Sequence, residues 1–138
     1  MALIDEKIAL FKAEVGDREL NEEQSKVFNA FSKKNGSVVK VHVVDCEGIC
    51  LKVSLDSSAE IRKVLSKHYR TTDGTVTALQ ILNMFDTVRT GYKYFSNGNV
   101  VYEKSWMDNG VKYFTVLKIY PNGKDAVFKS FYSTIGYK

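Results

Sequence analysis

Hydrophobic side chains near the N-terminus recur every three or four residues, which is the spacing of one face of a helix. Ile4, Ile8 and Phe11 follow this spacing and predict a first helix over 4–15. A second apolar stripe begins after Asn21, a residue type that caps helices well. Its members are Val27, Phe28 and Phe31. We therefore expect the chain to start with two helices.

The spacing then changes to a period of two, which is typical of strands. Alternating runs over 37–44 and 49–55 are separated by a turn at Glu47-Gly48, and together they predict a β-hairpin. Cys46 and Cys50 flank this turn. They fit either two small hydrophobic residues at a hairpin end or a local disulfide, and we assign them no chemistry.

Two further helices are expected between the hairpin and Gly91. The segment DSSAEIRKVLSKHYR places Ile61, Val64 and Leu65 on one face and ends near His68. After a short loop, Thr77 can cap a second, shorter helix, because its hydroxyl can accept a hydrogen bond from the first turn. This helix should fade before Gly91.

From Tyr92 onwards the period is two, with turn signals at 97–98, 108–110 and 121–123. The expected strands are 92–96, 100–107, 111–120 and 125–135. Strands joined by tight turns are antiparallel neighbours, so this meander should contain no parallel pair. We predict an α+β fold in one domain over 1–138. Helices and a hairpin occupy 1–56, and two helices with a C-terminal four-stranded antiparallel β-meander occupy 57–138.

The composition is that of a globular protein. Of 138 residues, 44% are hydrophobic and 26% charged, and no apolar run approaches the roughly 18 residues of a membrane span. The N-terminus carries acidic residues, unlike a signal peptide. We therefore expect a cytoplasmic protein with no membrane partner, with delivery into a target cell left open. No metal-binding spacing or nucleotide-binding fingerprint occurs, so neither metal nor cofactor is expected.

The charge is unevenly distributed along the chain. Residues 89–138 hold 8 Lys and Arg against 3 Asp and Glu, whereas residues 1–56 hold 8 against 10. An excess of +5 on the meander predicts a positive field that attracts a phosphate-bearing partner. The alternative is that the basic residues solvate the outer face of a sheet and discourage pairing at its edges.

Two polar residues interrupt aromatic faces of the meander. Strict alternation places Lys104 with Tyr102 and Trp106, and it places Ser130 with Phe128 and Tyr132. Polar groups in such positions need partners. An extended Lys with its ammonium in solvent and a satisfied Ser hydroxyl would also explain them. His68, near a helix C-terminus, fits either a proton-transfer group or a cation favoured by the helix dipole.

The segments SAEIRKVLSKHYR, TVTALQILNMFDTV and AVFKSFYST follow one another in an order that resembles the phage and toxin nucleases of the barnase, EndoU, colicin and RelE-like superfamily. The resemblance covers about 57–136. It implies a small metal-independent endoribonuclease, a toxin or phage-encoded enzyme, that cleaves RNA by attack of the 2′-hydroxyl. Tyr69 stands where this family usually has the Gly after its helix-end His.

The resemblance also implies a set of site residues. Its catalytic residues would be His68, Lys104, Ser130 and Tyr132. Phosphate contacts from Arg89 and Lys118, and base stacking on Tyr94 and Trp106, would complete the RNA site. The implied partners are RNA, including tRNA as a candidate, and a cognate inhibitor or immunity protein. Two alternatives stay open, namely a non-catalytic nucleic-acid-binding module and a protein–protein interaction domain of the immunity or inhibitor kind.

Overall fold

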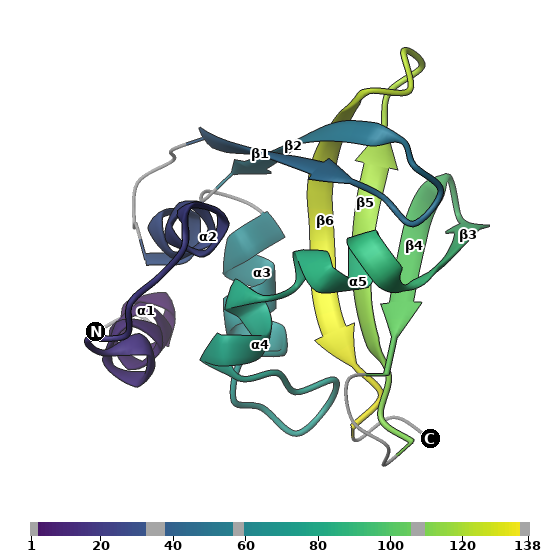
Figure 1. Cartoon of the computed structure of the whole chain (residues 1–138). Helices are drawn as coiled ribbons and strands as arrows, with labels where there is room; N and C mark the ends of the chain where they lie inside the picture. Colours follow the sequence, from purple (N-terminus) through teal and green to yellow (C-terminus); the bar gives the residue numbers. More distant parts are fainter. Residues whose placement is uncertain (1–2, 33–37, 57–59, 106–109, 136–138) are drawn as a thin grey trace.

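The structure is a computed structural model that describes residues 3–32, 38–56, 60–105 and 110–135. In these ranges the chain has the expected α+β class (Figure 1). The helices are α1 (Leu3–Val15), α2 (Glu22–Ser32), α3 (Glu60–Lys67), α4 (Ala78–Leu82) and α5 (Phe85–Thr90). The strands are β1 (Val38–Val44), β2 (Cys50–Asp56), β3 (Tyr92–Ser96), β4 (Asn99–Lys104), β5 (Tyr113–Ile119) and β6 (Asp125–Ser133). Trp106, and the predicted turn at 108–110 apart from its Gly, lie outside the described residues.

Reciprocal side-chain caps start two of the helices. Before α2, the Gln24 backbone N–H donates to Asn21 Oδ1 at 2.7 Å, and the Asn21 N–H donates to the Gln24 side chain at 3.1 Å. Thr77 and Gln80 make the same pair of bonds at the start of α4. Both predicted caps are therefore confirmed, and both satisfy backbone donors that lack a partner within the helix.

The expected helix after Thr77 is divided into α4 and α5. Gly91 follows α5 and lies where two backbone segments approach closely. A Cβ at this position would lie 2.2 Å from the Thr87 carbonyl oxygen and 2.6 Å from that of Glu103. The chain can therefore pass from α5 into β3 beside β4 only with a residue that has no side chain.

All six strands form one mixed sheet in the order β1-β2-β6-β5-β4-β3. The last four strands are consecutive antiparallel neighbours, as expected. The meander itself has no parallel pair, but the sheet is larger than expected, because hairpin strand β2 pairs with β6 in parallel from Lys52↔Asp125 to Ser54↔Val127. The hairpin therefore extends the meander. A long connection joins these two strands, so no turn signal in the sequence marks their pairing.

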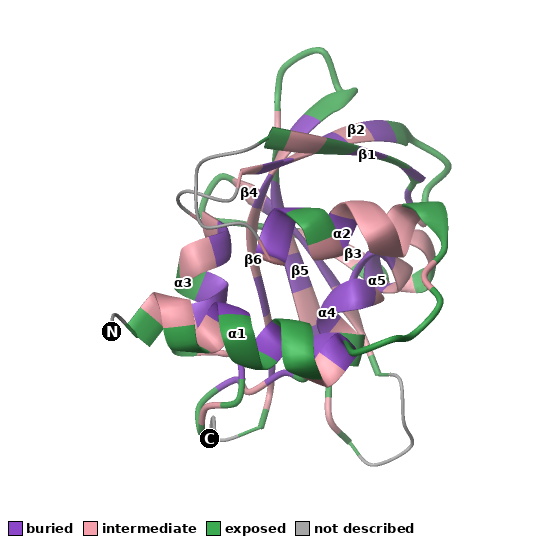
Figure 2. Cartoon of the chain, turned by 90° about the vertical axis from the view of Figure 1, so that its left-hand side faces the viewer, coloured by how far each residue is buried: buried purple, intermediate pink, exposed green. Residues whose placement is uncertain are grey.

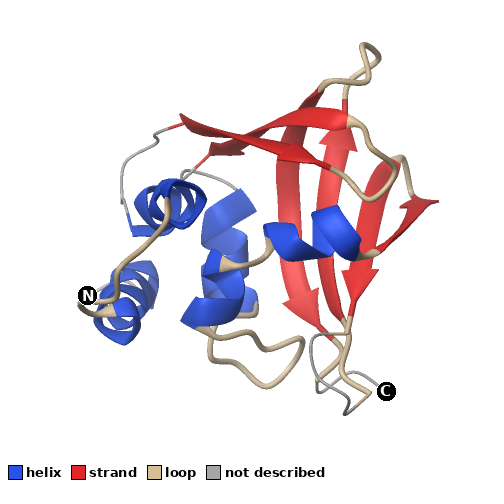
Figure 3. Ribbon diagram, in the orientation of Figure 1, coloured by secondary structure: helices blue, strands red, loops and turns tan. Residues whose placement is uncertain are grey.

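The sheet curls around one helix. The hairpin β1–β2 crosses the ends of the long strands, and α5 packs against β1, β3, β4 and β5 (Figure 1). The other helices gather on the same side of the sheet (Figure 3). Their buried stripes face inwards, while solvent-facing positions alternate with them along α1 and α2 (Figure 2). One hydrophobic core joins residues from 1–56 with residues from 57–138.

We call the helix-packed side of the sheet the inner face and the opposite side the outer face. Directly paired residues on neighbouring strands share a face. One inner-face row contains Lys93, Tyr102, Thr115 and Phe131. One outer-face row contains Tyr94, Val101, Val116 and Ser130.

A β-bulge changes which residues of β6 share a face. Ser130 pairs with Val116, but the next pair is Phe128 with Leu117, so Lys129 is the additional residue on β6. Such an insertion reverses the alternation beyond it. The prediction that Phe128 shares a face with Ser130 is therefore wrong. Phe128 is buried on the inner face, whereas Ser130 and, two residues further, Tyr132 lie on the outer face.

Candidate nucleic-acid interface

His68 directly follows α3 and lies beside β6. Its Nδ1 is 3.1 Å from the Asp73 carbonyl oxygen, and a carbonyl can only accept. Nδ1 therefore carries the proton, and in the neutral ring Nε2 is the nitrogen with a lone pair. The imidazole packs against the ring of Tyr132, with centroids 5.4 Å apart. The structure thus brings together two of the predicted catalytic residues.

A row of rings continues from His68 across the outer face. Tyr132 and Phe114 are cross-strand partners on β6 and β5, and their rings are stacked with centroids 5.1 Å apart at 26°. Both side chains are partly exposed. We call His68, Tyr132 and Phe114 the ring row. Further along the same face, Tyr94 packs against Tyr92 on β3, with centroids 5.9 Å apart.

Lysines precede and follow the ring row along the sequence of β5 and β6. Lys118 is exposed on the outer face of β5. Lys112 Nζ lies 3.2 Å from a carboxylate oxygen of Glu103, and Lys129, the bulge residue, lies 3.8 Å from Glu60 at the start of α3. Their ammonium groups are partly neutralised but stay accessible, with side chains 56% and 35% exposed. Ion pairs this exposed contribute little and are readily exchanged.

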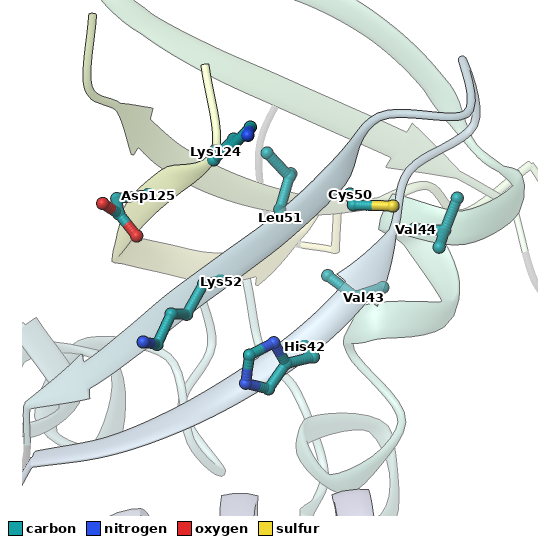
Figure 4. Close-up of a pocket in the computed structure, with 8 residues that line it drawn as sticks. All are labelled: His42, Val43, Val44, Cys50, Leu51, Lys52, Lys124 and Asp125. Carbon is teal, nitrogen blue, oxygen red and sulfur yellow. The ribbon is translucent and has the colours of Figure 1, made fainter. Parts of the chain in front are cut away.

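The hairpin adds cations to the outer face that the sequence reasoning did not assign to a site. Lys40 and His42 are exposed on β1, and Lys52 on β2 is the direct partner of His42. A hollow of about 460 Å³ opens beside His42 and Lys52, and Figure 4 shows the side chains that line it. It is lined by His42, Val43, Val44, Cys50, Leu51, Lys52, Lys124 and Asp125. Alternation in VVKVHVV was the available signal, because it separates Lys40 and His42 from the buried Val41 and Val43.

Lys104 does not join His68, Ser130 and Tyr132. It pairs with Tyr113, which in turn pairs with Ser133, so these three residues lie on the inner face. Its ammonium group donates to the Thr90 hydroxyl at the end of α5. The sheet therefore separates Lys104 from the ring row. The lysines of the meander do not form one patch, because Lys93 also points to the inner face.

Arg89 is held by carboxylates on two helices. It donates to Glu23 of α2 and, at 2.7 Å, to Asp86 of its own helix. Burial alone would lower the pKa of Arg89, but its hydrogen bonds and ion pairs with Glu23 and Asp86 outweigh burial and raise the pKa. This guanidinium connects α5 to α2, and it lies on the helical side of the molecule.

The inner face holds a buried ionic cluster of its own. Asp45 accepts from the Tyr102 hydroxyl at 2.8 Å and from Lys93 Nζ at 3.0 Å, and Lys93 also contacts Glu47 at 3.0 Å. Burial favours a raised pKa for Asp45. Hydrogen bonds from the Ile49 N–H, Lys93, Tyr102 and the Glu47 N–H outweigh burial and hold the pKa below its usual range. This cluster fastens the hairpin turn to β3 and β4.

Tyr69 has a structural role at the position where the nuclease family usually has Gly. Its side chain is fully buried, with the ring edge-on to Phe11 and the hydroxyl donating to Glu14 at 2.7 Å. Glu14 also accepts from the Ala78 N–H at 2.9 Å. The residue after His68 therefore anchors α1 and the start of α4.

Among the described residues, no group of three or more His, Cys, Asp and Glu side chains is placed to share a metal ion. Cys46 and Cys50 are both free thiols. No described helix is long and apolar enough to cross a membrane.

Comparisons of this chain with protein-family models, with curated proteins and with solved structures give no match.

Proposed function

We propose that this chain binds single-stranded RNA across the outer face of its sheet. The observation that carries the proposal is the ring row, in which the side chains of His68, Tyr132 and Phe114 lie in contact on an open sheet surface among lysines. Unpaired bases stack on aromatic side chains of this kind, and the phosphates then follow the neighbouring cations.

The distribution of positive charge favours a single-stranded RNA ligand over a double-stranded one. The cations of the outer face come from two parts of the chain. They are Lys40 and Lys52 of the hairpin and Lys112 and Lys118 of the meander, with Lys129 of the bulge next to α3. Glu103 and Glu60 offset part of this charge. A broad, moderately positive surface with exposed rings suits a flexible strand, which can place bases and phosphates independently.

Ribonuclease activity is the second candidate, and the contact between His68 and Tyr132 favours it. Nε2 of His68 can accept the proton of a 2′-hydroxyl, and the hydroxyls of Tyr132 and Ser130 lie on the same face. Lys104 is on the other side of the sheet, so the charge developing on phosphate would be met by Lys129 or Lys118. If the protein is a ribonuclease, we propose that it acts as a toxin and that a cognate inhibitor protein binds it.

Binding is tested by titrating a fluorescein-labelled oligouridylate and following its anisotropy. Wild-type protein should bind at low salt. Phe114→Ala should weaken binding about 5- to 150-fold, because stacking contributes about 1–3 kcal/mol per base. Leu79→Ala removes an exposed apolar side chain from α4 and serves as the control, with wild-type affinity expected. Absence of binding by the wild type, or equal loss in both variants, would contradict the proposal.

Cleavage is tested separately by incubating the protein with total tRNA in EDTA. If His68 transfers protons, His68→Ala should reduce the cleavage rate by about 10² or more. Its effect on folding should be small, about 0.5–1.5 kcal/mol, because it removes the exposed hydrogen bond to Asp73 and the contact with Tyr132. If the wild-type protein binds RNA but does not cleave it, the binding proposal stands and the ribonuclease proposal is contradicted.

A further inference from the structure

Strand β3 is one of the two end strands of the sheet and carries the most exposed aromatic side chains in the described part of the chain. Tyr92 and Phe95 are 67% and 78% exposed. In Figure 1, β3 lies at the margin of the molecule with its outer edge facing away from the other strands. An end strand presents unpaired backbone N–H and C=O groups along such an edge.

β3 lacks two features that usually prevent such edges from pairing, an exposed charge and a Pro. Its one charged residue, Lys93, points inwards to Asp45 and Glu47, and its side chain is only 7% exposed. The strand sequence YKYFS contains no Pro. The other end strand, β1, differs, because Lys40 is exposed there. Charged side chains and Pro on an edge are what discourage pairing with a second chain.

The hairpin geometry shows which groups of β3 face outwards. Asn97 and Gly98 form a two-residue turn with φ of 52° and 80°, between the paired Ser96 and Asn99. The pair that flanks such a turn is hydrogen-bonded, and bonded pairs alternate along the ladder. Bonded positions towards β4 are therefore 92, 94 and 96. The backbone groups of Lys93 and Phe95 consequently point to the free edge.

We propose that β3 pairs antiparallel with β3 of a second copy of this chain, around a two-fold axis at Tyr94. This register pairs Lys93 with Phe95 of the partner in both directions, which uses the outward backbone groups. No like charges oppose each other, and the arrangement is self-complementary, as a two-fold interface requires. Tyr94 then faces its own copy on the outer face.

The dimer would make the two outer faces continuous. Tyr94 of both copies would meet at its centre with one Tyr92 on either side, and aromatic cross-strand pairs stabilise sheets. The inference stands on the edge geometry alone and does not depend on RNA binding.

The register is tested by disulfide trapping in a Cys46→Ser, Cys50→Ser background. In Tyr94→Cys the two thiols face each other across the axis, where directly opposed Cβ atoms are close enough for a disulfide. Tyr92→Cys is the matched control. Position 92 is more exposed, but it opposes Ser96 of the partner and lies far from its own copy. Mild oxidation should give a covalent dimer of Tyr94→Cys and little of Tyr92→Cys.

Sedimentation equilibrium of the unmodified chain tests association itself. Wild-type protein should show a concentration-dependent dimer. Tyr94→Lys should be monomeric, because it opposes two ammonium groups at the axis, whereas Val38→Lys at the other end strand should dimerise as the wild type does. A monomeric wild type at every concentration, or equal crosslinking of both cysteine variants, would overturn the proposal.

Discussion

The two faces of the sheet differ in the burial and the pairing of their charged side chains. On the inner face, Asp45, Lys93 and Tyr102 are buried together and hydrogen-bonded to one another. On the outer face, Lys118 is exposed, and Lys112 has only an exposed ion pair. The buried charges of the inner cluster are paired with one another, as a stable fold requires, because an unpaired buried charge is strongly destabilising. The exposed lysines of the outer face contribute little to the stability of the fold.

Strand β3 shows the same contrast within three residues. Lys93 points to the inner face and fastens the hairpin, whereas Tyr92 and Tyr94 point to the outer face. The presence of a lysine in a basic segment therefore does not indicate a ligand contact. Its face, its burial and its partners decide between a structural and a binding role.

The largest expected effect is loss of the inner cluster. Lys93→Met leaves the Asp45 carboxylate buried without its cation, and it should lower the free energy of unfolding by about 3–5 kcal/mol. Urea denaturation measures this change. Lys118→Met on the outer face is the control and should change stability by less than about 0.5 kcal/mol. Similar changes in the free energy of unfolding for the two substitutions would contradict the different roles that we assign to lysines on the two faces.

A somewhat smaller effect is expected from pH. Because the pKa of Asp45 is lower in the folded state than in the unfolded chain, its contribution to stability is present above the unfolded pKa of about 4. That contribution is lost as the pH falls through the folded pKa. Urea denaturation between neutral and acidic pH should therefore show declining stability. Asp45→Asn should be less stable at neutral pH and less sensitive to pH in this window, and an unchanged slope would contradict this role.

The smallest effect concerns a single outer-face cation. If Lys118 contacts a phosphate, Lys118→Gln should reduce the slope of log affinity against log salt for oligouridylate by about 0.7. Lys12→Gln on α1 offers a matched exposed lysine on the helical side and should leave the slope unchanged. A wild-type slope near zero would show that binding, if present, does not depend on phosphates.

Local features of the fold were predictable from the sequence, whereas pairing at a distance was not. The caps at Asn21 and Thr77 follow from adjacent residues, and so do the strands of the meander. The parallel pairing of β2 with β6 depends on segments about 70 residues apart, and no turn encodes it. The bulge did leave a signal. Phe128 and Phe131 are three residues apart, so strict alternation would have exposed one of them.

The candidate site was predictable to a similar extent. His68 and Tyr132 were expected at one site, and their rings are in contact. Lys104 was placed there by its resemblance to a family position, but strand alternation turns it to the inner face. The distribution of charge along the sequence did not indicate Lys40 and Lys52, because only the curled sheet brings the hairpin beside the meander.

The central claim is that RNA binds the outer face and leaves the inner face untouched, and amide chemical-shift mapping tests it most directly. Titration of the isotope-labelled chain with oligouridylate should shift the amides of Phe114, Val116, Ser130 and Tyr132, together with those of Ser54 and Lys118. Amides of α1, α2 and α4 should stay in place. Shifts confined to the helical side, or no shifts at concentrations that saturate the anisotropy signal, would contradict the account.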